Sequence, residues 1–181
     1  MNIIKELENS KNKKGLRILP EDTILMLLYS HSDKPIINRT VLMKEVFLTY
    51  EEVLKKENGI ELLNPEFFGH KFGPFSYRVS EAIWFLVSNG MIQVKGRAKG
   101  RKEEFRITEK GIGMIKLLLK KMKKDMVKVL IEDLTNKRKG WDQLGRNGIL
   151  NYVYKMYENY AEKSKIKEKY GMTIWGELFK E

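Results

Sequence analysis

Cysteine is absent from the 181-residue sequence, which excludes disulfide bonds, thiolate zinc sites and cysteine nucleophiles. Proline occurs four times, and no apolar run approaches the ~20 residues that a membrane-spanning helix needs. Residues 1–19 mix apolar side chains with lysines and lack the apolar core of a secretory signal. We therefore expect a cytoplasmic protein without a membrane partner.

The common patterns of catalytic and metal sites are also missing. The acidic residues show no pairing typical of a two-metal nuclease, and no glycine-rich phosphate loop ends in Lys-Ser or Lys-Thr. His70 lies in a predicted loop without a second ligand nearby, and His31 lies at a predicted helix end, where its charge would favour the helix dipole. We assign neither histidine a role, and we expect no enzyme activity, no metal site and no cofactor.

Positive charge is concentrated in one part of the chain. The sequence is 42% hydrophobic and 33% charged, a balance typical of globular proteins, and its net charge is +11. Residues 1–90 carry 12 basic and 12 acidic side chains, residues 91–140 carry 16 against 6, and residues 141–181 carry 7 against 6. General use of lysine would spread this charge evenly, so the distribution indicates a basic functional surface.

Three helices are predicted in the first half of the chain. The first begins at Pro20 and ends near residues 30–33, and the second runs from a cap at Asn38 or Thr40 to about Lys56. Residues 60–72 are expected to form a loop with apolar side chains. The turn at residues 72–76 opens the third helix, which ends at Ser88 because Asn-Gly follows.

The pattern then changes from helical to alternating. Residues 91–94 and 105–108 predict two strands around a glycine-containing loop, and Thr108 caps a long helix over residues 109–134. Further helices are expected near residues 148–160 and 172–179. The fold class is therefore mainly α with a small β-hairpin, in the order of a winged helix-turn-helix. We divide it into a polar lead-in (1–19), the winged-helix domain (20–135) and a C-terminal helical extension (136–181).

Several motifs resemble the YwgA-type winged-helix proteins of bacteria and archaea, over roughly residues 20–170. They are Gly69-His70-Lys71-Phe72-Gly73-Pro74-Phe75-Ser76, Gly90-Met91-Ile92, Arg106-Ile107-Thr108-Glu109-Lys110-Gly111 and Leu150-Asn151-Tyr152-Val153-Tyr154, with Tyr157 and Ser164-Lys165-Ile166-Lys167. The resemblance implies mainly the fold, and no catalytic residues can be carried over. A similar Gly-Pro turn occurs in domains related to the SocA antitoxin, so neutralising a partner protein stays open. The loop of the hairpin departs from the family in its richness in arginine and lysine.

This loop, the predicted wing, is the main candidate site. Its basic residues are Lys95, Arg97, Lys99, Arg101, Lys102 and Arg106. Gly96 and Gly100 let the backbone approach a phosphate or enter a minor groove, where the flat arginine side chain fits well. The alternative is a solvated tip whose charges protect a sheet edge. Such a tip would normally mix signs, whereas no acid occurs before Glu103.

The third helix is the recognition helix by position. Its candidate exposed residues are Ser76, Tyr77, Arg78, Ser80, Glu81 and Trp84. We expect Tyr77 and Arg78 to reach base edges or phosphates. Since Arg78 is the one cation in this set and Glu81 repels phosphate, the helix is expected to contribute position more than sequence reading.

Two further groups have competing interpretations. Lysines lie along the predicted long helix, and they belong either to the basic surface or to a solvated or dimer-forming face. These residues are Lys116, Lys120, Lys121, Lys123, Lys124 and Lys128, and Lys137, Arg138 and Lys139 extend the group. Tyrosines near the C-terminus suit base stacking or, as we favour from their helical spacing, packing; they are Tyr152, Tyr154, Tyr157, Tyr160 and Tyr170.

The sequence thus predicts a nucleic-acid-binding protein, and we favour a DNA-binding transcriptional regulator, a homodimer that binds double-stranded DNA through its wing and recognition helix; the charge pattern alone leaves RNA as an open alternative. The alternative is an antitoxin-like protein-interaction module that caps an acidic partner protein. In that case the same basic stretch would contact protein carboxylates.

Overall fold

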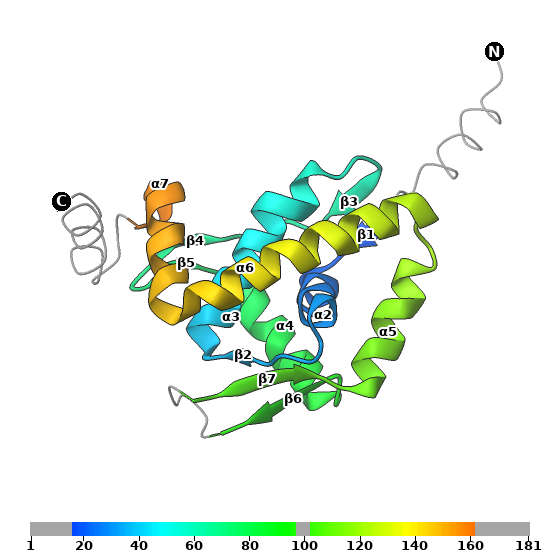
Figure 1. Cartoon of the computed structure of the whole chain (residues 1–181), viewed down its shortest axis with the longest axis horizontal. Coiled ribbons are helices and arrows are strands. Elements are labelled where there is room, and N and C mark those ends of the chain that lie inside the picture. Colours follow the sequence, from blue (N-terminus) through cyan, green and yellow to red (C-terminus); the bar gives the residue numbers. More distant parts are fainter. Residues whose placement is uncertain (1–15, 97–101, 162–181) are drawn as a thin grey trace, which may run out of the picture.

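Helix α2 (Pro20–Ser30) lies at the centre of the computed structural model, which describes residues 16–96 and 102–161 and is mostly helical with small sheets (Figure 1). Every residue from Ile24 to Leu28 is at most 3% exposed. Pro20 occupies the first turn, and the Asp22 carboxylate accepts a hydrogen bond from the Leu19 amide at 2.9 Å. The predicted first helix is confirmed.

The second predicted helix is also confirmed, although its final turns are irregular. Asn38 caps α3 (Arg39–Leu48), because its side-chain oxygen accepts the Thr40 amide at 2.8 Å. The chain continues as a π-helical segment (Thr49–Val53) and a 3₁₀ turn (Leu54–Lys56). Together these segments place Phe47 and Val53 in the core, at 0% and 1% exposure.

Short strands replace the expected loop at residues 60–72. Strand β3 (Ile60–Leu62) pairs in parallel with β1 (Leu16–Ile18), so the end of the predicted lead-in belongs to the fold. Strand β4 (Phe68–His70) pairs antiparallel with β5 (Gly73–Phe75). Strands of three residues show too little alternation to be recognised from sequence, and the partner of β3 is distant in the chain. Residues 1–15 of the lead-in lie outside the described residues.

Helix α4 (Tyr77–Ser88) and the following hairpin agree with prediction. Ser76 caps α4 by accepting the Val79 amide at 3.1 Å, and its hydroxyl donates to the Pro65 carbonyl. Strands β6 (Ile92–Lys95) and β7 (Glu104–Ile107) pair antiparallel, and β2 (Ile36–Ile37) extends the sheet beyond β7. Residues far apart in the chain therefore form one three-stranded sheet.

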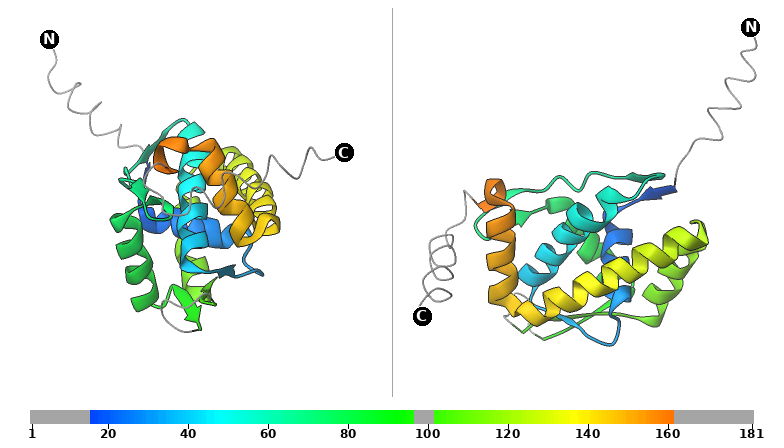
Figure 2. Two further views of the ribbon diagram at one scale, coloured as in Figure 1. Left: turned by 90° about the vertical axis from the view of Figure 1, so that its left-hand side faces the viewer. Right: turned by 45° about the horizontal axis from the view of Figure 1, so that its top comes forward.

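The predicted long helix over residues 109–134 is wrong in one respect. Helix α5 (Glu109–Leu119) ends at a turn, and α6 (Lys124–Met156) begins a new direction (Figures 1 and 2). The apolar spacing continues through the turn, with Met122 9% exposed, so periodicity does not reveal the break. Helix α6 packs on α2 and α3, and α7 (Glu158–Ala161) follows it.

Helix α6 also contains the predicted boundary between residues 135 and 136, so the secondary structure does not separate the two parts there. Gly145, with a φ of 61°, kinks this helix. The predicted helix at residues 172–179 lies outside the described residues. Within the described ranges, no helix combines the length and the apolarity needed to cross a bilayer.

Arg138 is a core residue and not, as expected, part of the basic surface. Its side chain is fully buried, and it donates to the carbonyls of Leu27 at 2.8 Å and Lys34 at 2.9 Å. Its Nε lies 3.6 Å from Glu45 Oε2 and 3.8 Å from Asp142 Oδ2. Burial raises the pKa of Glu45, and the Arg138 charge opposes this shift. Arg138 thereby joins α6 to the carboxyl end of α2 and to α3.

We predict that Arg138→Met lowers the free energy of unfolding by about 3–5 kcal/mol, because it leaves Glu45 and buried carbonyls without their partner. Urea denaturation followed by circular dichroism measures this change. The matched control is Lys139→Met at the exposed neighbouring position, expected within about 0.5 kcal/mol of the wild type. Equal effects of the two substitutions would contradict the conclusion that Arg138 joins α6 to α2 and α3.

Candidate functional site

The wing residues divide into described and undescribed positions. Lys95 and Lys102 are exposed at the end of the hairpin, whereas Arg97, Lys99 and Arg101 lie outside the described residues. Arg106 is half-buried at the base of the hairpin, where it donates to the Asp33 carbonyl at 3.3 Å. Arg106 is thus engaged within the protein and is not part of the exposed end.

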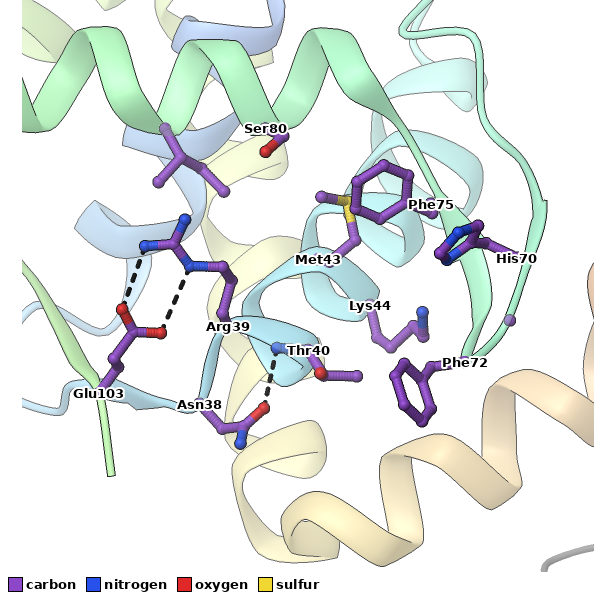
Figure 3. Close-up of a pocket in the computed structure, with 12 residues that line it drawn as sticks. Asn38, Arg39, Thr40, Met43, Lys44, His70, Phe72, Phe75, Ser80 and Glu103 are labelled. Atoms are coloured by element: carbon purple, nitrogen blue, oxygen red, sulfur yellow. Dashed lines mark hydrogen bonds and ion pairs between the residues drawn. The ribbon is translucent and has the colours of Figure 1, made fainter. Parts of the chain in front are cut away.

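Glu103 is the acidic residue nearest the wing loop in the sequence, but its carboxylate does not offset the positive charge of that loop. This side chain is 1% exposed, and its carboxylate accepts two hydrogen bonds from Arg39, at 3.1 and 3.3 Å (Figure 3). The Glu103 carbonyl also accepts the Asn38 amide at 2.7 Å. These contacts attach the hairpin to the N-terminus of α3. The Glu103 charge is therefore balanced by Arg39 inside the protein and is not exposed on the wing.

Helix α4 exposes aromatic more than basic side chains. Tyr77, Trp84 and Phe85 are 64%, 67% and 52% exposed. Arg78 pairs with Glu66 at 2.7 Å. Ser76, expected at the surface, is fully buried because its hydroxyl caps the helix.

The sequence did not identify Phe85 as an exposed residue. The spacing of the buried positions of α4 nevertheless places Phe85 on the opposite, exposed face. Those inward positions, Val79, Ile83 and Leu86, are at most 1% exposed and follow helical spacing. Ser80 and Glu81 differ, since Ser80 is half-buried and lines a cavity while Glu81 is exposed. The outer face of α4 is therefore mainly aromatic, with one exposed cation, Arg78, and one exposed acid, Glu81.

The lysines of α5, of the turn that follows it and of the start of α6 form a separate surface, which we call the lysine corner; its members are Lys116, Lys120, Lys121, Lys123, Lys124 and Lys128, all exposed. The β6–β7 hairpin extends away from this corner (Figures 1 and 2). Lys137 pairs with Glu52 at 3.3 Å. The expected single basic surface is thus divided, since the turn after α5 and the burial of Arg138 interrupt it.

The C-terminal tyrosines that the structure describes pack, as we favoured. The Tyr152 and Tyr157 hydroxyls donate to Glu52 at 2.9 and 3.2 Å. The rings of Tyr157 and Tyr160 contact Phe47 edge-on, with centroids 4.8 and 5.0 Å away. Burial, together with the Glu52 carboxylate, raises the pKa of Tyr152 to about 12. Tyr170 lies outside the described residues.

A cavity of about 340 Å³ lies between α3, the β4–β5 hairpin, α4 and Glu103 (Figure 3). Its lining includes Arg39, Met43 and Lys44 from α3, with His70, Phe72 and Phe75 from the hairpin region. Sequence reasoning missed this site because its walls come from segments that are far apart in the chain. The one available signal is Lys44-Glu45, which interrupts an otherwise apolar stretch of α3.

Lys44 is the unusual group of this cavity. It is 2% exposed, and its Nζ donates to the Pro74 carbonyl at 2.6 Å. Burial lowers the pKa of Lys44 to about 7. Gly73 has a φ of +81°, and a Cβ there would lie 2.6 Å from the Tyr154 ring. The Gly-Pro turn therefore presents its carbonyl to Lys44 in a conformation that requires glycine.

Comparison with known proteins adds no assignment to these sites. No sequence model of a known protein family matches the chain, and no curated protein matches it significantly. Among the described residues, no group of three histidine, aspartate or glutamate side chains could hold a metal ion.

We predict that the wild type gains stability relative to Lys44→Met as the pH rises from about 7 to 10, because the pKa of Lys44 is about 7 when folded and ordinarily 10.5. Between these values the unfolded chain binds a proton that the folded chain lacks, so higher pH favours folding by up to about 1.4 kcal/mol per pH unit. Urea denaturation at several pH values measures the difference. A difference independent of pH would show that Lys44 titrates normally.

Proposed function

We propose that the protein is a winged-helix DNA-binding protein. In this assignment α2, α3 and α4 form the helical core, and the sheet of β2, β7 and β6 carries the wing. Helix α4 takes the place of the recognition helix because it is the third helix of this core. The element order and the position of the hairpin beside α4 support the assignment.

The observation that carries this function is the charge at the end of the β6–β7 hairpin. Lys95 and Lys102 are exposed there, and they flank the sequence Gly-Arg-Ala-Lys-Gly-Arg. Glu103 is buried against Arg39, so the nearest carboxylate does not cancel this charge. Glu104, opposite Lys95, is partly exposed and lies 3.8 Å from Arg106, so basic residues still outnumber acidic ones at this end of the hairpin. An excess of cations attracts a phosphate backbone.

Helix α4 is assigned a positioning role. Arg78, its candidate base-reading cation, pairs with Glu66 and also donates to the Asn64 carbonyl at 3.4 Å. Contacts to phosphates position a protein without reading sequence. We therefore propose binding that depends strongly on salt and weakly on DNA sequence.

We also propose that two copies of the chain form a homodimer. The side chains available to a second copy include Met114 and Leu117 on α5 and Val129 on α6, which are 45%, 56% and 60% exposed. Sedimentation velocity tests this stoichiometry.

A second candidate function, capping an acidic partner protein, is favoured by two features. The exposed aromatics of α4 are side chains typical of protein interfaces. The lysine corner surrounds a groove of about 410 Å³ whose floor includes Leu119, Met122 and Val127. Cations around an apolar floor suit a protein surface that combines carboxylates with apolar side chains.

We predict that fluorescence anisotropy with random-sequence duplex DNA gives a log–log salt slope of roughly −4 to −5, for about five neutralised phosphates. Replacing Arg97, Lys99 and Arg101 together by alanine is expected to weaken binding broadly and to flatten the slope by about 2–3. The matched control, alanine at Lys120, Lys121 and Lys124 of the lysine corner, removes the same charge and is expected to leave the slope unchanged.

Two outcomes decide between the candidates. Equal losses from both triple variants would remove the wing as the DNA site. No DNA binding at low salt would overturn the first function, and a search for an acidic protein partner with the same variants would follow.

A further inference from the structure

The cavity beside Lys44 has the size and lining of a small-molecule site. Ligand sites in proteins typically enclose about 300–1,000 Å³ with mostly apolar walls and a few polar groups, and this cavity encloses about 340 Å³. Met43, Phe75 and Ile83 supply apolar wall, and Phe72, 44% exposed, lines it as well. The polar groups come from Arg39, Thr40, Lys44, His70, Ser80 and Glu103, with Asn38.

The charges around this cavity leave one buried cation without an anion. Arg39 and Glu103 pair with each other. Among the described residues, no carboxylate oxygen forms an ion pair with Lys44 Nζ within 4.0 Å, and burial alone accounts for its lowered pKa. The neighbouring Glu45 carboxylate faces Arg138 instead. Because an unpaired buried charge is costly, an anion beside Lys44 would be strongly stabilised.

We propose that this cavity binds a small aromatic carboxylate. The carboxylate pairs with the Lys44 ammonium, and the ring packs against Phe72 and Phe75. A single buried ammonium suits a monoanion, and the apolar walls suit a ligand with a flat hydrocarbon body. The site does not depend on nucleic-acid binding.

The arrangement of side chains supports this geometry. Figure 3 shows Lys44 between the rings of Phe72 and Phe75, with the Arg39–Glu103 pair across the cavity. The Lys44 ammonium has further N–H groups besides the one that the Pro74 carbonyl accepts. The cavity is also lined by Ser80 and Ile83 of α4 and by Glu103 of the hairpin, so a bound ligand contacts both elements.

The first test is calorimetric titration of the full chain with 2-naphthoate and with its neutral isostere 2-naphthamide. We expect naphthoate to bind at least tenfold more tightly than naphthamide. Lys44→Met is expected to weaken naphthoate at least tenfold and to leave naphthamide unchanged, while the control Lys139→Met binds as the wild type does. Failure of both ligands to bind the folded wild type, or undiminished naphthoate binding by Lys44→Met, would overturn the proposal.

A second variant keeps the test valid if Lys44→Met does not fold. Phe72→Ala removes ring surface at an exposed position, and we expect it to weaken both ligands at least threefold. Unchanged binding of both by a folded Phe72→Ala would refute the assigned position of the ring.

The second test follows the pKa of Lys44 by NMR with ¹³Cε-labelled lysine. Bound naphthoate favours the ammonium, so its saturation is expected to raise the Lys44 pKa from about 7 by at least one unit. The same linkage makes naphthoate affinity fall as the pH rises above about 7. Other titratable or charged groups near Lys44 are His70 on β4, Arg39 on α3, Glu103 before β7 and Tyr154 on α6. Residue-specific detection separates Lys44 from them, and an unchanged Lys44 titration at saturation would overturn the proposed pair.

Discussion

The Arg138 guanidinium joins α2, α3 and α6, because it donates to buried backbone carbonyls and lies 3.6 Å from the buried Glu45 carboxylate. Its hydrogen bonds reach Leu27 and Leu28 in the last turn of α2, at 2.8 and 3.3 Å, and Lys34 beyond it. A cation at this position also complements the negative end of the α2 dipole. Beside Arg138, Asp142 contacts His31 at 2.7 Å. The Lys34 carbonyl, which accepts from Arg138, lies two residues before β2 begins.

A second buried cation organises the other side of α3. Lys44 donates to the Pro74 carbonyl, and Ser76, two residues later, caps α4. The Gly-Pro turn therefore connects the cavity to the N-terminus of the helix that carries the exposed aromatics. Arg39, at the N-terminus of α3, pairs with Glu103 at the base of the hairpin. Helix α3 thus contacts both the Gly-Pro turn that leads to α4 and the base of the β6–β7 hairpin.

Basic residues that are contiguous in the sequence lie on separate surfaces in the structure. Residues 91–140 form one basic stretch in the sequence, with 16 basic against 6 acidic side chains. In the structure the hairpin and the turn between α5 and α6 that carries the lysine corner point away from each other (Figure 1). The positively charged Arg138 is buried. Proximity in the chain does not imply a common surface when a tight turn redirects a helix. The two surfaces therefore suit separate contacts.

Local patterns by themselves determined α2, α3, α4, the β6–β7 hairpin and the cap at Thr108, and they offered Asn38 as one of two caps of α3, since caps, glycine stops and helical spacing act within a few residues. They also placed Lys95 and Lys102 on an exposed hairpin. Only the tertiary structure decided the pairing of β1 with β3, the break after α5, and the burial of Lys44 and Arg138. These features depend on partners far apart in the chain, because a buried charge is stable only where distant carbonyls and carboxylates meet it.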